Sequence, residues 1–357
     1  MKKLFLIVAA TAALGLTAAS GLFAQDKPIY PAPGEGWHKA KPEKYGFPKE
    51  ALNDLTKFLI DSTYATGVTV IVGGEMIYSF GAQDRLSYIA SCRKSVLAMM
   101  YGKYVENGTI NLDETVEELG LDDIGGLLPI EKKARVIDLV TARSGCYHPA
   151  SNAGDSEEKP ARGTKKPGKY FLYNNWDFNV AGAVFEMKTG KNIYDAFQED
   201  IGSQIGLQDW DREAQKKGGN LKVSIYPAYH FYFSVRDMAR IGYLMLREGN
   251  WDGNQVLSRE WVGRIVSPVS SYKEVRKRHS VPRFSYGYMW WLFDDAAPKN
   301  TPAFHGGYTA RGAMGQYITV LPALDMVVAF KTDAVYKRKT PSSAYFRFLD
   351  RLVQIKE

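Results

Sequence analysis

The pattern of apolar and polar positions divides the chain into strand-rich ends and a helical middle. Residues 48–62 have apolar side chains at helical spacing, and residues 67–81 form two β-rich runs around Gly73-Gly74. This pattern predicts a helix followed by a hairpin. A second helix is expected from about Ser91 to Glu106, closed by Asn107-Gly108. The N-terminal part therefore supplies two strands and two helices.

The middle of the chain, from Asn111 to about Leu221, has short helical stretches and polar loops with little β pattern. Beyond it the strand pattern returns. We expect a helix at 233–250, a turn and helix at 251–266, strands at 285–293, 312–322 and 326–332, and a final amphipathic helix at 341–355. The pattern predicts an α/β fold in which an antiparallel sheet from both chain ends is flanked by helices, with an all-helical domain of about residues 111–221 inserted.

The first residues have the form of an export signal. Two lysines precede an apolar, alanine-rich run and small residues, which predicts cleavage after Ala24 or Ser20. A membrane anchor is the alternative, but the run is short for a span. We expect a signal peptide over residues 1–24, an extended lead-in over 25–45 and one domain over 46–357. The protein is then periplasmic or secreted, with no stable membrane anchor.

Composition limits the partners of the chain. The net charge of +7 comes from scattered basic residues, which favours a solvated basic surface over nucleic-acid binding. The five histidines stand far apart and no cluster has metal-ligand spacing, so we expect no metal and no cofactor. An exported chain of this length does not need disulfides. We expect Cys92 and Cys146 to be reduced, and a single bridge between them is the alternative.

Ser91 and Lys94, in the segment SCRK, are the candidate catalytic pair. Spacing of three places both side chains on one helix face, and a serine needs a base to become a nucleophile. The lysine can be that base only when neutral, and burial favours its neutral form. Free N–H groups at a helix start also favour a developing oxyanion. Ser-x-x-Lys occurs again at Ser156 and Ser270, and helix capping is the alternative role for Ser91.

Two further segments extend this candidate site. Tyr173 and Asn175 belong to the only Tyr-x-Asn of the chain, at a junction between an extended piece and a helix. Tyr173 could carry a proton between serine, lysine and leaving group, and Asn175 could hold a substrate amide. His305-Gly306-Gly307 are expected at a strand edge, where glycines allow a substrate to approach the backbone. A core tyrosine, a helix cap and a plain hairpin turn are the structural alternatives.

The segments SCRK, YNN and HGG, in this order, resemble motifs of the serine β-lactamase and penicillin-binding-protein superfamily. The likeness is to its class C branch, with D,D-peptidases, esterases and 6-aminohexanoate-dimer hydrolase-like enzymes. It runs from about residue 45 to the C-terminus and includes SGCYH, FSVRDMARIG and GQYITVLPALDMVV. The resemblance implies a sheet domain and an all-helical domain with the active site between them.

The resemblance also implies roles for single residues. Ser91 falls on the nucleophile, Lys94 on its lysine partner and Tyr173 on the proton-relay tyrosine. We therefore predict an exported serine hydrolase that cleaves an amide or ester of a small molecule or short peptide through an acyl-enzyme. The alternatives are a non-catalytic penicillin- or peptidoglycan-binding relative, and a true class C-type β-lactamase or D,D-peptidase. The substrate and the oligomeric state remain open.

The substrate-binding positions depart from the superfamily pattern. Asn175 falls on the second Tyr-x-Asn position, and His305-Gly306-Gly307 fall on a motif that is usually Lys-Thr-Gly in β-lactamases. The backbone N–H groups of Ser91 and Tyr308 would form the oxyanion hole. Lys-Thr-Gly itself occurs at 188–190, but there it ends a predicted helix. Because histidine replaces a fixed cation, we expect weak nitrocefin hydrolysis compared with a short-chain ester.

A basic loop at 149–169 completes the candidate features. It contains Lys159, Arg162, Lys165, Lys166 and Lys169. These side chains could border the cleft, although a solvated loop is the simpler interpretation.

Overall fold

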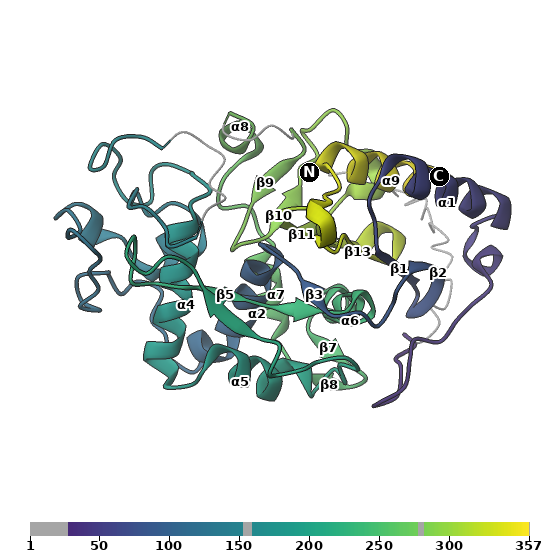
Figure 1. Ribbon diagram of the computed structural model, residues 1–357, viewed down its shortest axis with the longest axis horizontal. Helices are drawn as coiled ribbons and strands as arrows, with labels where there is room; N and C mark the ends of the chain where they lie inside the picture. Colours follow the sequence, from purple (N-terminus) through teal and green to yellow (C-terminus); the bar gives the residue numbers. More distant parts are fainter. Residues whose placement is uncertain (1–27, 153–158, 278–281, 357) are drawn as a thin grey trace, which may run out of the picture.

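The central feature of the protein is one antiparallel seven-stranded sheet. The computed structural model describes residues 28–152, 159–277 and 282–356, so the expected signal peptide lies outside the described residues. The order β2-β1-β13-β12-β11-β10-β9 joins the first two strands of the chain to its last five (Figure 1). The strands of this sheet are β1 (Gly67–Val72), β2 (Glu75–Gly81), β9 (Phe284–Tyr286), β10 (Trp291–Phe293), β11 (Tyr308–Gly312), β12 (Gln316–Leu321) and β13 (Met326–Lys331).

Helices cover both faces of the sheet. Helix α6 (Val235–Leu246) packs against β1, β12 and β13. On the other face lie α9 (Ser342–Lys356) and α1 (Lys49–Ser62), which contact each other (Figure 1). Because both faces are covered, every residue of β1, β12 and β13 is buried. The sheet from both chain ends, flanked by helices, confirms the predicted fold class.

The part of the chain between β2 and β9 carries the remaining helices and three small two-stranded sheets. Within about 111–221 the structure has long loops, several short helices and one helix of 15 residues, α4, and β4 at the end of this stretch is its only strand among the described residues. None of the described helices has both the length and the apolar character needed to cross a membrane. The helices are α2 (Cys92–Glu106), α3 (Val136–Val140), α4 (Asn175–Thr189), α5 (Ile193–Phe197), α7 (Arg259–Ile265) and α8 (Tyr272–Val275). The paired strands are β3 (Ser87–Tyr88) with β6 (Tyr232–Phe233), β4 (Lys216–Gly218) with β5 (Ala228–His230), and β7 (Asn250–Trp251) with β8 (Asn254–Gln255).

Cys92 and Cys146 are buried free thiols, which confirms the expectation of reduced cysteines. The Cys92 thiol donates to the carbonyl of Gln316, and the Cys146 thiol donates to the carbonyl of Glu131. The two thiols therefore occupy separate places in the core. Burial raises the pKa of both thiols, which suppresses the reactive thiolate.

Titration of the unreduced protein should consequently find two thiols after denaturation and slow labelling of either in the native state. The measurement is reaction with a chromogenic disulfide reagent, with and without denaturant. A denatured sample without free thiols would contradict the structure.

Candidate active site

Ser91 stands at the junction between β3 and helix α2. The chain turns at Ala90, whose φ of 49° lies in the left-handed region that alanine rarely adopts. This turn places Ser91 immediately before the first helical residue, Cys92. Ser91 is partly exposed, whereas most of α2 is buried. The Ser91 backbone N–H makes no hydrogen bond with any described residue, so it is free to interact with a bound molecule.

Lys94 joins the candidate residues into one cluster. It is 1% exposed, and its Nζ donates to Ser91 Oγ over 3.1 Å, to Tyr173 Oη over 2.7 Å and to Asn175 Oδ1 over 2.6 Å. The structure thus brings together four predicted site residues from α2 and from the start of α4. Asn175 is buried, and its side-chain oxygen accepts a hydrogen bond from Lys94. Asn175 therefore orients the lysine side chain.

Tyr173 is held by aromatic packing. Its ring lies 4.9 Å from that of Phe178 and 5.4 Å from that of Trp291, and its hydroxyl also interacts with Ser91. Burial raises the pKa of Tyr173 above its ordinary value, although the charges of Arg93 and Arg311 oppose this. The phenol is therefore protonated at neutral pH, as a proton donor must be.

A free edge of β11 lies beside Ser91. Strand β10 pairs with β11 only at Tyr308 and Thr309, because the chain at Met289 turns away to accept a hydrogen bond from Ser95 of α2 over 2.6 Å. From Ala310 onward, β11 is paired only with β12 among the described residues. Backbone groups alternate between the two sides of a strand, and the Gly307 carbonyl accepts from Phe293 of β10. The backbone N–H and C=O of Arg311, four residues after Gly307, therefore point to the same side of β11 as the Gly307 carbonyl. At Arg311 no strand pairs with that side among the described residues.

Gly312 sets the distance between this edge and the nucleophile. A Cβ at Gly312 would lie 2.5 Å from the carbonyl oxygen of Ile89 and 3.2 Å from Cβ of Ala90. A backbone oxygen cannot yield at that separation without moving the turn that presents Ser91. Glycine is thus required here for the close approach of β11 to the start of α2.

Gly312→Ala should reduce kcat/KM by roughly 100-fold, because displacement of about 1 Å at a catalytic group has effects of this size. Gly263→Ala is the matched control, since a Cβ at Gly263 of α7 meets no atom within 4 Å. Ester hydrolysis and thermal melting of both variants make the comparison. Retention of more than a third of wild-type activity by a folded Gly312→Ala protein would show that this contact does not position Ser91.

The structure places His305-Gly306-Gly307 at the other end of β11, which corrects the expectation that this strand edge lies beside Ser91. The His305 side chain is 74% exposed and pairs with Asp295 over 2.9 Å. A Cβ at Gly307 would contact Phe304, Leu321 and Phe293, and not the turn before Ser91. Strands rise about 3.3 Å per residue, so the start of β11 is roughly 13 Å from Gly312.

Tyr308 is also buried in the protein interior. Its backbone is paired on both sides, with Leu292 of β10 and Val320 of β12. Its hydroxyl donates to the Met245 carbonyl over 2.9 Å. The physical reason for both corrections is strand register, which sequence spacing does not reveal. Gly312 lies shortly before the sequence GQYITV. Its position could have indicated which end of β11 lies beside Ser91.

Other sequence candidates lie elsewhere. Lys188 ends α4 and pairs with Glu114 over 2.8 Å, while Gly190 caps the helix in the left-handed conformation, as expected for the Lys-Thr-Gly at 188–190. In the basic loop, Arg162 forms an ion pair with Glu131. Ser270 is buried and accepts from Arg143 over 2.6 Å, which removes it as a nucleophile.

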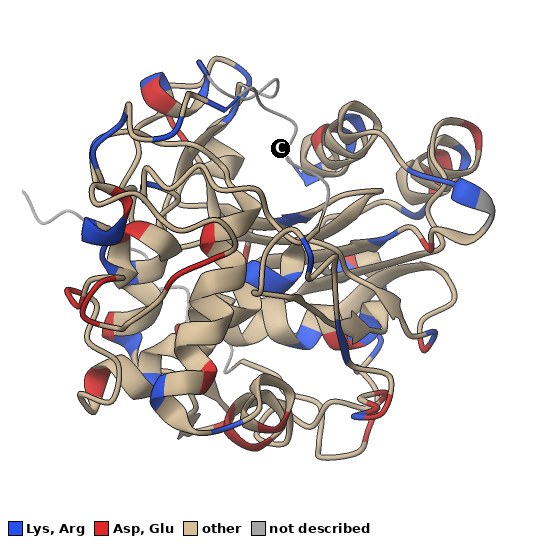
Figure 2. Cartoon of the chain, turned by 60° about the vertical axis from the view of Figure 1, so that its left-hand side comes forward, with Lys and Arg blue, Asp and Glu red and all other residues tan. Residues whose placement is uncertain are grey.

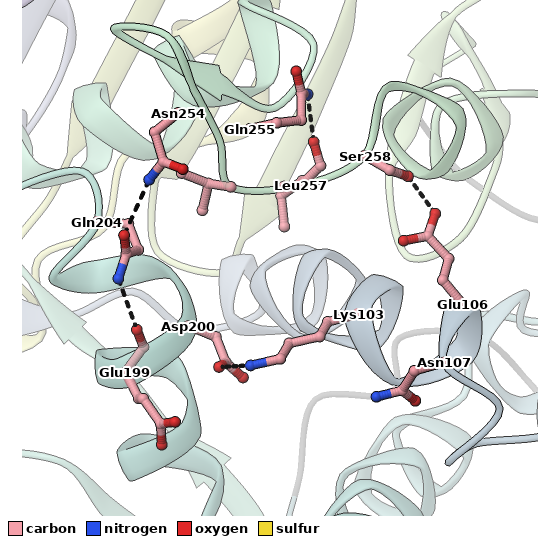
Figure 3. A pocket seen from close by; sticks show the side chains of 11 residues that line it. Lys103, Glu106, Asn107, Glu199, Asp200, Gln204, Asn254, Gln255, Leu257 and Ser258 are labelled. Carbon is pink, nitrogen blue, oxygen red and sulfur yellow. Dashed lines mark hydrogen bonds and ion pairs between the residues drawn. The ribbon is translucent and has the colours of Figure 1, made fainter.

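A pocket of about 690 Å³ lies at the opposite end of α2 (Figure 3). Its polar side chains satisfy one another: Lys103 pairs with Asp200 over 2.6 Å, and Ser258 donates to Glu106. Lys103 follows Ser91 by three helical turns, or roughly 18 Å along the helix. The pocket is therefore separate from the Ser91 cluster. Among the described residues, no three metal-binding side chains gather there or elsewhere.

Comparison with known proteins identifies the family of this chain. The sequence model of the Beta-lactamase family matches residues 61–350. The chain belongs to the Beta-lactamase family. Family members of this fold are generally serine hydrolases, which accords with a serine, lysine and tyrosine in one cluster. An uncharacterised protein of Alkalihalophilus pseudofirmus is 20% identical over 69% of this chain and 73% of its own length.

Solved structures share the fold of this Beta-lactamase-family protein. A protein of Bacillus anthracis, provisionally named a 6-aminohexanoate-dimer hydrolase, superposes with a TM-score of 0.67 at 18% identity, covering 92% of this chain and 89% of that one. A class C β-lactamase mutant gives 0.62 at 16% identity, over 86% and 96%. EstCE1, a hydrolase with promiscuous acyltransferase activity, gives 0.60 at 15% identity, over 85% and 97%.

Proposed function

We propose that this protein is an exported serine hydrolase that cleaves an ester or amide through a Ser91 acyl-enzyme. The observation that carries the proposal is the position of Lys94 Nζ, within hydrogen-bond distance of both Ser91 Oγ and Tyr173 Oη. Nucleophile, base and proton carrier are then in contact before a substrate binds.

In the first half of the reaction, Ser91 Oγ attacks the substrate carbonyl carbon and its proton passes to Lys94, which enters this step as the neutral amine because Tyr173 is already protonated. Lys94 then returns this proton to Tyr173 after the phenol has protonated the leaving group. The Ser91 backbone N–H faces the oxyanion that forms. The second donor we propose is the backbone N–H of Ala313, the first residue of the turn that follows β11. The bond to the leaving oxygen or nitrogen then breaks as Tyr173 donates a proton to it, which leaves the acyl-enzyme.

In the second half, water replaces the departed alcohol or amine. It gives one proton to the Lys94–Tyr173 pair and adds its oxygen to the acyl carbon. The bond to Ser91 Oγ breaks, the serine regains a proton, and the carboxylic acid leaves. Protons and electrons balance without any cofactor.

A fluorophosphonate probe tests the proposal directly, since it reacts only with an activated serine. The expected result is one equivalent of label on the peptide that contains Ser91, together with hydrolysis of p-nitrophenyl acetate. If the protein is not labelled and shows no esterase activity, the non-catalytic binding relative is supported instead. Such a protein does not need an intact cluster of Ser, Lys and Tyr.

The expectation of weak nitrocefin hydrolysis rested on His305 beside Ser91. Because His305 lies at the far end of β11, that reason no longer applies, and the β-lactamase and D,D-peptidase alternatives stay open. The groups that can contact a substrate are those of the residues at the Gly312 end of β11.

A further inference from the structure

Asp177 carries a buried carboxyl group that the proposed reaction does not use. It lies in the first turn of α4, two residues after Asn175, and is 1% exposed. Its Oδ1 atom accepts hydrogen bonds from Ser144 Oγ over 2.6 Å and from Asn174 Nδ2 over 2.8 Å. Both partners are neutral side chains, and a buried carboxyl group with neutral partners is costly to ionise.

The partners of Asp177 connect two segments of the site. Asn174 Nδ2 also donates to the carbonyl of Cys146 over 2.7 Å, and Ser144 Oγ also accepts from the backbone N–H of Cys146 over 2.9 Å. Ser144, Cys146 and Asn174 are themselves buried. Asp177 therefore ties the loop 144–146 to the start of α4.

Asn174 lies between the two residues of α4 and its approach that contact Lys94. The Lys94 Nζ atom donates to Tyr173 Oη over 2.7 Å and to Asn175 Oδ1 over 2.6 Å. A shift of the Asn174 backbone would move both contacts, and a displacement of about 1 Å at a catalytic site can reduce its rate by roughly 100-fold. The carboxyl group of Asp177 is thus placed to control the geometry of the site from outside it.

The protonation state of Asp177 follows from its surroundings. Burial raises its pKa to about 8, although its hydrogen bonds and the charge of Lys159 oppose this rise. The Cys146 thiol and the Tyr286 phenol also interact with it, but burial raises the pKa of both, so both stay neutral. Lys and Arg are interspersed with Asp and Glu over the molecule (Figure 2), so no extended charge of one sign acts on this group. Asp177 is therefore mostly a neutral acid at pH 7.

We propose that Asp177 is a positioning residue whose carboxyl group holds residues 173–175 in contact with Lys94. The inference rests on the proposed hydrolase function, and Asp177 acts through Tyr173 and Asn175 and not on the substrate. The neutral carboxyl group fits its buried network, whereas the ionised form would require water or a counter-ion. Ionisation should therefore displace the segment and lower the activity.

Asp177→Asn tests this proposal, because an amide keeps an acceptor oxygen and does not ionise. The measured quantity is kcat/KM of the variant divided by that of the wild type for p-nitrophenyl acetate, since kcat/KM reports the ionisation of the free enzyme. This ratio should be about 10-fold higher at pH 9 than at pH 7, because only about a tenth of an acid stays protonated one pH unit above its pKa. A ratio that does not change with pH would overturn the proposal, since a merely structural contact would give that result.

Asp237→Asn is the matched control. Asp237 is a buried carboxyl group in the first turn of α6, where it accepts from the backbone N–H groups of Gln208 and Asp209 over 2.9 and 2.8 Å. Burial raises its pKa as well, but its hydrogen-bond partners lie outside the Ser91 cluster. The kcat/KM ratio of this variant should be the same at pH 7 and pH 9. An equal rise in both variants would contradict a specific role for Asp177.

Thermal melting tests the protonation state of Asp177 without any use of activity. The folded protein holds this proton up to about pH 8, whereas an unfolded aspartic acid releases it near pH 4. The contribution of Asp177 to stability therefore falls as the pH rises from about 4 to 8. The Tm of Asp177→Asn minus that of the wild type should rise over this interval and then stay level.

A constant difference in Tm would contradict the neutral carboxyl group on which the proposal depends. If the Tm difference rises as expected but the protein hydrolyses no ester and fluorophosphonate does not label Ser91, it is the proposed hydrolase function that fails.

Discussion

Ser91→Ala should abolish fluorophosphonate labelling and reduce the rate of ester hydrolysis by at least about 1,000-fold. Catalytic residues that act as a unit lose most of their rate enhancement when one of them is removed. The fold should persist, since Ser91 is partly exposed and the hydrogen-bond partners of its side chain among the described residues are Lys94, over 3.1 Å, and Tyr173, both in the site itself. Intact-mass spectrometry after labelling and a thermal melt of the same sample provide both readouts.

Ser270→Ala is the matched control, because Ser270 is the serine of a second Ser-x-x-Lys within the described residues but is buried and bonded to Arg143. It should label like the wild type, with at most a modest loss of stability from one hydrogen bond, about 1 kcal/mol. Full labelling of Ser91→Ala, or loss of labelling in a folded Ser270→Ala protein, would assign the nucleophile elsewhere.

Tyr173→Phe should lower kcat by about 100-fold or more, the usual contribution of a positioned acid–base group, with little change in melting temperature. The phenylalanine ring keeps the contacts with Phe178 and Trp291 and removes only the hydroxyl that accepts from Lys94 over 2.7 Å. Steady-state kinetics and a thermal melt distinguish this loss of chemistry from a loss of structure.

The comparison variant is Tyr286→Phe. Tyr286 contacts the Tyr173 ring at 6.2 Å, and its buried hydroxyl has no hydrogen-bond partner among the described residues. Removing that hydroxyl should therefore leave kcat close to the wild-type value. If Tyr173→Phe retains more than a tenth of wild-type kcat, the relay role of Tyr173 is wrong.

The non-catalytic alternative makes opposite predictions for these variants. A binding relative would need the shape of the site and not the Ser91 hydroxyl, so Ser91→Ala would bind its ligand unchanged and the wild type would show no turnover. The contact among Ser91, Lys94 and Tyr173 favours the hydrolase, because binding alone requires no proton path between serine and phenol.

The parts of the site that depend on interactions between neighbouring residues could be predicted from the sequence. Ser91 and Lys94 are three residues apart on one helix, so helical spacing alone places them on the same face, and the structure joins them over 3.1 Å. The β1–β2 hairpin around Gly73-Gly74 and the C-cap at Gly190 likewise depend on neighbouring residues. The fold class followed from periodicity at the two chain ends.

Only the tertiary structure decided what faces the nucleophile. Tyr173 follows Lys94 by 79 positions, and only packing between α2 and α4 brings them to 2.7 Å. Gly307 and Gly312 lie on either end of the same strand, so motif order could not distinguish them; strand register and the contact of Gly312 with Ile89 could.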